Sequence, residues 1–262
     1  MNHQEGYFRG YQDFKIYHQC WLPDSQQRAV LLLAHGYAEH SGRYGNVVDY
    51  FVPRNFAVYA LDHRGHGKSG GERVHVEDFH DYVVDLKTYF DIVRSKNPAQ
   101  KIFLIGHSMG SVISLCYCLE YQSELAGLIT SGGGLTRPSD PPLQAPPKGQ
   151  PLSVAMLSRD PAVIEAYVND PLVYHGPVPI NHSMRGTMAN LVGEVGRIKL
   201  PVLIMAGAGG PDGARSQVLF DLIGSQDKTF KPYTGLLHEI FNEPEYPRVM
   251  ADMEQWLQNH LY

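Results

Sequence analysis

The feature that most constrains this chain is a serine at the junction of a short apolar segment and a helix-compatible one. Residues 101–110 read KIFLIGHSMG, so Ser108 lies at the centre of a G-x-S-x-G pattern. The apolar run that ends at Gly106 predicts a buried strand, and residues 111–121 predict a helix. A serine at such a strand-to-helix turn is typical of a nucleophile elbow, whose glycines leave room for the tight turn. The pattern predicts a nucleophilic serine, although a turn with an incidental serine has the same five residues.

Two further segments support a catalytic interpretation. Residues 29–37 read AVLLLAHGY, an apolar strand that runs into His-Gly, and in α/β-hydrolases such a loop supplies an oxyanion-hole N–H group. By this comparison the backbone N–H groups of Tyr37 and Met109 bind the oxyanion. Residues 233–239 place His238 in a loop late in the chain, after a predicted strand. Because triads of this class run serine, acid, histidine along the chain, His238 is the candidate base.

Four motifs, spaced over nearly the whole chain, resemble the monoacylglycerol lipase (lysophospholipase-like) family of α/β-hydrolases. They are HGYAEHSGRY at 35–44, DHRGHGKSGGER at 62–73, GHSMG at 106–110 and GLLHEIFNEPE at 235–245. The resemblance implies the α/β-hydrolase fold, which is a mostly parallel central sheet with helices on both faces and a cap insertion. It also implies a serine hydrolase that cleaves carboxylic esters without a cofactor, with monoacylglycerol or lysophospholipid as the substrate class.

The triad acid is where the chain departs from the family pattern. The family places this acid three residues after a glycine that ends the preceding strand, but here Gly207 is followed at that distance by Gly210. Alignment backward from His238 places Asp212 on the family's second aspartate, with a short deletion before it. Asp212 is therefore our candidate acid, in a loop pliant enough for its carboxylate to reach the histidine. Asp140 is a minority alternative, and the third possibility is a triad that lacks its acid.

Strand-like and helix-like segments alternate along most of the chain, which predicts an α/β class with a mostly parallel sheet. An antiparallel pair is expected at 7–10 and 15–22. The alternation stops in a proline-rich stretch, so we expect a core from residues 1–134 and 197–262 and a shortened cap at 135–196. The cap's isolated leucines favour a more open acyl site. Further strands are expected at 30–34, 57–61, 125–131, 201–206 and 229–233, and helices near 44–54, 79–95, 162–168, 216–223 and 244–259.

Composition argues against several other function classes. The 262 residues include 22 basic and 27 acidic ones, for a net charge of −5 without a basic block, so we expect no nucleic-acid partner. The aliphatic run 29–34 is too short to span a bilayer, no signal peptide is evident, and contact with lipid surfaces is expected to be transient at most. Cys20, Cys116 and Cys118 form no metal-binding pattern, which favours buried thiols in a reducing cytoplasm. Since the histidines also lack zinc-ligand spacing, we expect no metal.

The predicted reaction follows from the candidate residues. Ser108 attacks the carbonyl of a small ester or monoacyl lipid while His238 takes its proton and Asp212 orients the imidazole, and water then cleaves the acyl-enzyme. Glu239, directly after the histidine, is interpreted as a residue that fixes its loop. The alternative is a catalytically weak homologue that binds a small ligand or a protein partner. Acyl transfer, thioester cleavage or amide cleavage would use the same residues.

Overall fold

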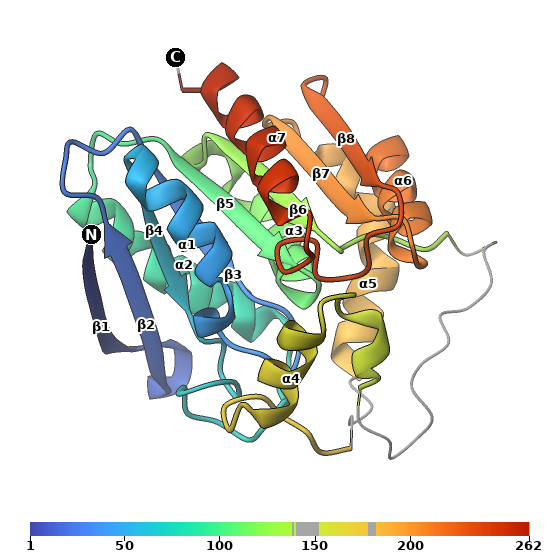
Figure 1. Ribbon diagram of the computed structural model, residues 1–262, viewed down its shortest axis with the longest axis horizontal. Helices are drawn as coiled ribbons and strands as arrows, with labels where there is room; N and C mark the ends of the chain where they lie inside the picture. The colour runs from blue at the N-terminus through green and yellow to red at the C-terminus, as the bar shows by residue number, and fades with distance from the viewer. Residues whose placement is uncertain (138, 140–151, 178–181, 262) are drawn as a thin grey trace.

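The computed structural model describes residues 1–137, 139, 152–177 and 182–261 (Figure 1). Eight strands form one sheet in the order β1-β2-β4-β3-β5-β6-β7-β8. β1 pairs with β2, and β2 with β4, in antiparallel register, whereas the remaining neighbours are parallel. This is the mostly parallel sheet that the alternating pattern predicts. The strands are β1 (Asn2–Arg9), β2 (Lys15–Leu22), β3 (Ala29–Ala34), β4 (Phe56–Leu61), β5 (Ile102–His107), β6 (Gly127–Ser131), β7 (Val202–Gly207) and β8 (Lys228–Tyr233).

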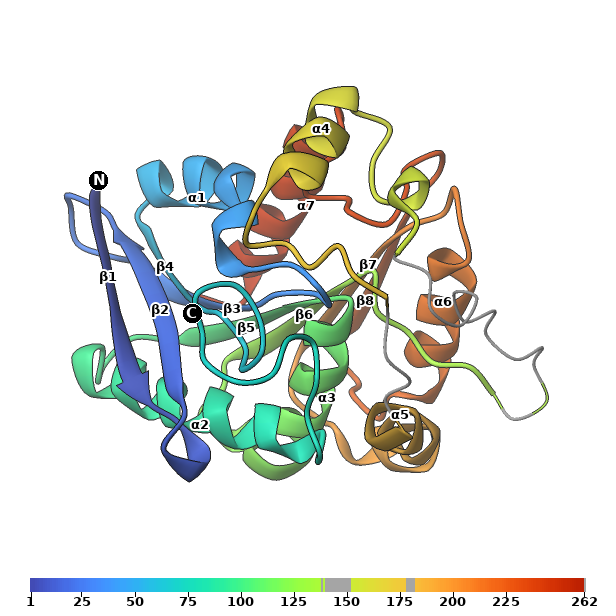
Figure 2. The same cartoon turned by 90° about the horizontal axis from the view of Figure 1, so that it is seen from below.

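Helices cover both faces of the sheet (Figure 2). α1 (Gly45–Phe51) and α7 (Tyr246–Asn259) pack on one face, and α2 (His80–Lys96), α3 (Met109–Tyr121) and α6 (Asp212–Leu222) pack on the other. Every residue of β3 to β7 is therefore buried, which explains why these strands are almost continuously apolar rather than alternating. Among the described residues, no helix combines the length and apolar character needed to cross a membrane.

Two helices belong to the range expected to form the cap. α4 (Pro161–Asn169) matches the short helix predicted there, and the Asp160 side chain caps it by accepting the N–H of Ala162. α5 (His182–Glu194) was not predicted; it packs against α3 and buries Leu191 in the same core as α2. Much of the proline-rich stretch, including Asp140, lies outside the described residues, and the cap boundaries at 135 and 196 stay a prediction.

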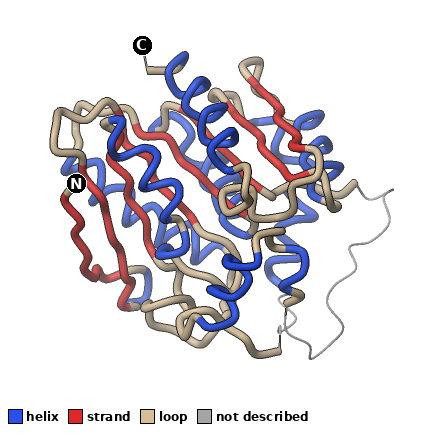
Figure 3. Tube along the Cα trace, in the orientation of Figure 1, coloured by secondary structure: helices blue, strands red, loops and turns tan. Residues whose placement is uncertain are grey.

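The loops that follow the parallel strands gather at one end of the sheet (Figure 3). In parallel sheets the carboxyl ends of the strands meet at this edge, where binding sites form. The loop after β3 carries Tyr37, the turn after β5 carries Ser108, and α6 begins at Asp212 after β7. The loop after β8 carries His238 and passes close to the end of β7. A Cβ added to Gly207 would lie 1.9 Å from the carbonyl oxygen of Leu237.

Close packing of α3 against β3 predicts a stability effect at Gly110. A Cβ at this position would lie 2.0 Å from the backbone oxygen of Ala34, so Gly110→Ala must push the helix away from the strand. We expect it to lower the free energy of unfolding by about 1–3 kcal/mol, as overpacking does. Gly186→Ala in α5 is the matched control, because its new Cβ would meet nothing within 4 Å and should stabilise by up to about 1 kcal/mol. Urea denaturation measures both variants, and equal midpoints would contradict the packing described.

Candidate active site

Ser108 occupies a strained turn between β5 and α3. Its backbone has φ 52° and ψ −115°, a left-handed conformation that is costly for a residue with a Cβ. The surrounding structure holds this turn in place, because the Ser108 N–H donates to the Ser131 oxygen at 2.8 Å. Gly106 also allows a close approach, since a Cβ there would lie 2.5 Å from the Gly110 oxygen. The G-x-S-x-G pattern thus forms the elbow that the sequence predicts.

The loop after β3 lies against this serine. A Cβ on Gly36 would lie 3.3 Å from the Ser108 Cβ, which brings the adjoining Tyr37 to the same place. Met109 is the first residue of α3, where helical N–H groups have no intrahelical acceptor. Within the described ranges, neither the Tyr37 N–H nor the Met109 N–H donates to another protein group. Two unpaired donors next to a strained serine are what an oxyanion requires.

The candidate base and the candidate acid are hydrogen-bonded to each other. His238 Nδ1 lies 2.7 Å from Asp212 Oδ2, and since a carboxylate only accepts, the imidazole donates through Nδ1. Asp212 does not lie in a pliant loop. It is the first residue of α6 and only 7 % exposed, with Arg215 Nη1 3.6 Å from its other oxygen. The shortened loop therefore leads directly into a helix that fixes the carboxylate.

This pairing sets the charge of both side chains. Burial alone would lower the pKa of His238, but the hydrogen bond and the charge of Asp212 outweigh it and raise that pKa above its ordinary value of 6.5. Burial alone would raise the pKa of Asp212, but the hydrogen bond to His238 helps to lower that pKa below its ordinary value. An ionised acid thus supports the imidazolium that would form during catalysis. The neighbouring His107 ring lies 4.9 Å from that of His238, and burial lowers its pKa to about 4, so it packs as a neutral ring.

An arginine that sequence reasoning missed joins the oxyanion loop to the histidine loop. Arg43 Nη1 lies 2.8 Å from Glu39 and 2.7 Å from Glu239, and its Nη2 lies 2.9 Å from the second oxygen of Glu239. Glu39 in turn accepts the Gly36 N–H at 2.6 Å. Burial alone would raise the pKa of Glu39, but the charge of Arg43 helps to lower it to about 2. Glu239 thus fixes its loop, as interpreted from the sequence, through an arginine within the first of the four motifs.

The described part of the expected cap contacts the same edge of the sheet. Figure 1 shows α4 beyond the carboxyl ends of the central strands. His40 Nε2 lies 2.8 Å from Asp170 Oδ2, and the Tyr174 N–H donates to the Ala38 oxygen at 2.8 Å. The residues that follow α4 are therefore attached to the loop that carries Tyr37.

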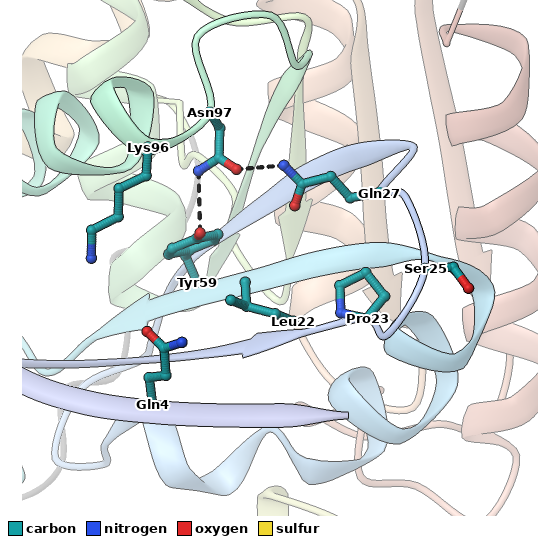
Figure 4. A pocket seen from close by; sticks show the side chains of 8 residues that line it. All are labelled: Gln4, Leu22, Pro23, Ser25, Gln27, Tyr59, Lys96 and Asn97. Carbon is teal, nitrogen blue, oxygen red and sulfur yellow. Dashed lines mark hydrogen bonds between the residues drawn. The ribbon is translucent and has the colours of Figure 1, made fainter.

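Two cavities lie outside the set of candidate catalytic residues. One, of about 160 Å³, is lined by residues 171–175 and by residues of the loops after β3 and β4. The other, of about 380 Å³, lies where β2 ends and before β3 begins, and none of the candidate catalytic residues lines it. Figure 4 shows the side chains that do. The residues that line this larger cavity are Gln4, Leu22, Pro23, Ser25, Gln27, Tyr59, Lys96 and Asn97.

In the part of the chain that the structure describes, no group of three His, Cys, Asp or Glu side chains is arranged to hold a metal ion.

Known proteins are similar to this chain in sequence and fold. The family model described as serine aminopeptidase, S33, matches residues 25–245. A monoacylglycerol lipase of Mycolicibacterium smegmatis is 37% identical over 97% of this chain and 96% of its own. A human monoglyceride lipase is 30% identical over 92% of this chain and 86% of its own. The crystal structure of Paleococcus ferrophilus monoacylglycerol lipase matches with a TM-score of 0.78 and 29% identity, over 94% of this chain and 99% of that one. These matches confirm the α/β-hydrolase fold expected from the sequence.

Proposed function

The chain belongs to the monoacylglycerol lipase-like family of serine hydrolases, which the serine aminopeptidase S33 model matches, and we propose that it cleaves monoacylglycerols through a Ser108–His238–Asp212 triad. It is a carboxylic ester hydrolase. The observation that carries the triad proposal is the 2.7 Å hydrogen bond between His238 and the buried Asp212 at the edge of the sheet that holds the Ser108 elbow. The names of the relatives support the substrate class.

The proposed mechanism assigns one step to each group. The Ser108 oxygen bonds to the ester carbonyl carbon while its proton passes to His238 Nε2, and the Tyr37 and Met109 N–H groups stabilise the oxyanion. The carbon–oxygen bond to the alcohol then breaks, and the alcohol leaves with the proton from His238. Water repeats the sequence on the acyl-enzyme, which releases the fatty acid and restores Ser108. Asp212 holds the imidazole by Nδ1 and stabilises its charged form throughout.

We further propose that residues 135–196 act as a cap over this site. The support comes from the described part of that range, because Asp170 and Tyr174 are bound to the loop that carries Tyr37. The α4 helix beside them has a single charged residue, Glu165, and its Val168 is 51% exposed. A cap of this character fits a substrate with an apolar chain.

Steady-state hydrolysis of a monoacylglycerol, a lysophospholipid, a short-chain ester and an aminoacyl amide tests the proposed function. Ser108→Ala supplies the background rate for each compound. We expect the monoacylglycerol to have the highest Ser108-dependent kcat/KM, and the amide to be the poorest substrate. If the amide or the lysophospholipid exceeds the monoacylglycerol by about tenfold, which is about 1.4 kcal/mol in transition-state binding, the substrate proposal is wrong. Absence of any Ser108-dependent turnover would favour the catalytically weak binding protein instead.

A further inference from the structure

The main chain at His238 is held partly by the cap segment. The His238 N–H donates to the Met156 oxygen at 3.0 Å, and the Glu239 N–H donates to the Leu157 oxygen at 2.7 Å. Both acceptors lie in or directly after the short helical turn Val154–Met156. The orientation of a catalytic side chain depends on the groups that hold its backbone and neighbours. The position of the imidazole therefore depends on the position of this cap segment.

A buried carboxylate joins the same two segments. Glu243 is 1% exposed, and its Oε1 accepts the N–H of Leu237, the residue before the base, at 2.7 Å. Its Oε2 accepts from Arg159 twice, from the backbone N–H at 3.2 Å and from Nε at 3.1 Å. Arg159 also pairs with Glu245 at the surface. Glu243 thus bonds to the histidine loop with one oxygen and to the cap with the other.

The end of β7 and the segment after it contact the same loop. The end of β7 approaches so closely that a Cβ on Gly207 would overlap the Leu237 carbonyl, and the Gly209 N–H donates to the Leu236 oxygen at 2.8 Å. The segment at the end of β7 therefore contacts the carbonyl groups of Leu236 and Leu237, whereas Glu243 and the cap segment accept three successive N–H groups from Leu237 onward. A buried carboxylate is costly unless each oxygen is hydrogen-bonded, and here both are.

We propose that Glu243, paired with Arg159, is a positioning residue that fixes cap segment 156–159 to the histidine loop and so keeps the imidazole aligned with Asp212. Glu243 acts through His238 and touches no substrate. The proposal rests on the proposed function, in which His238 is the base. A movement of segment 156–159 away from the loop would therefore also disturb the base, because the His238 N–H would lose its acceptor.

Glu243→Gln is the variant that tests this role. It keeps the shape and an oxygen for the Leu237 N–H, but it removes the charge that faces Arg159 and introduces a second donor there. We expect kcat to fall about tenfold, since small displacements of catalytic groups have effects of this size or larger, with KM within about twofold of wild type. Because a looser bond to Asp212 raises the pKa of His238 less, the acid limb of kcat/KM should move to lower pH.

Glu254→Gln is the matched control. Glu254 also pairs with an arginine, Arg54, and accepts a hydroxyl hydrogen bond, from Tyr50 at 2.9 Å, but it lies in α7 away from the histidine loop. Its kcat, KM and pH profile should match wild type. Arg159→Gln removes the cation of the pair with Glu243. The Arg159 side chain is 41% exposed, so this variant should fold even if Glu243→Gln does not. It should lower kcat and shift the acid limb in the same direction.

The pH profile separates positioning from a merely structural role. If either variant lowers kcat only in proportion to the folded fraction, with the wild-type acid limb, the positioning role is wrong. Wild-type kcat in a folded Glu243→Gln enzyme would also overturn it. Failure of the proposed function has a different signature, because then the wild-type enzyme itself has no Ser108-dependent turnover. In that case the Nδ1 proton signal of His238 in NMR spectra tests the alignment of the imidazole with Asp212 directly. An unchanged signal in both variants would overturn the proposal.

Discussion

Ser108→Ala is expected to lower kcat/KM for ester hydrolysis by at least about 10³-fold, and by as much as about 10⁶-fold, because Ser108 forms the acyl-enzyme in the proposed mechanism. The protein should stay folded, since the methyl side chain keeps the Cβ that the elbow already accommodates. Steady-state kinetics with a monoacylglycerol measures the loss. Ser123→Ala, at an exposed position in a short helical turn, is the control and should retain the wild-type rate.

A Ser108→Ala enzyme that retains most of the wild-type rate would move the nucleophile elsewhere. The elbow would then be a structural turn with an incidental serine, which is the other interpretation of the G-x-S-x-G pattern. Its φ of 52° would have no function to account for it.

Asp212→Asn is expected to lower kcat/KM by about 10⁴-fold, as loss of the acid does in serine proteases. Asparagine has nearly the same shape but lacks the charge that stabilises the imidazolium, and it can hold the wrong tautomer of His238. The pH profile should change as well. In the wild type, Asp212 raises the pKa of His238 above 6.5, so activity falls as the pH drops through that higher value. Without the charge the pKa of His238 falls, and the acid limb moves to lower pH.

Asp221→Asn is the matched control for this experiment. Asp221 lies in the same helix, α6, but it is exposed and pairs with Arg137 rather than with a histidine. Its rate and pH profile should equal those of the wild type. Retained activity in Asp212→Asn, with an unmoved acid limb, would place the acid elsewhere. Asp140 would then become the first residue to replace.

Local patterns were enough to predict most of the sheet and to select Ser108 and His238 as the candidate nucleophile and base. Ser108 is recognisable because strand, glycine turn and helix are contiguous in sequence, and His238 because chain order constrains it. The candidate acid was harder to select. The segment after Gly207 departs from the family spacing, and only the structure shows that α6 begins at Asp212 and directs its carboxylate to the histidine.

Contacts between distant segments account for what the sequence could not predict. Arg43 and Glu239 are 196 positions apart, and no local pattern indicates that they pair. α5 contains Gly186 and Gly193, which weaken helix propensity, so its formation depends on packing Leu191 into the core beside α3. The bond from the His238 N–H to Met156 joins two main-chain groups, whose partners side-chain identity does not reveal.

Mass spectrometry of the protein after reaction with a fluorophosphonate probe tests the central claim most directly, because such probes bond only to an activated serine. The account predicts one adduct, mapped to Ser108 by peptide analysis. It should be absent in Ser108→Ala and should form far more slowly in Asp212→Asn, while Asp221→Asn labels at the wild-type rate. An unlabelled wild-type protein, or an adduct on a different residue that abolishes hydrolysis, would contradict the claim that His238 and Asp212 activate Ser108.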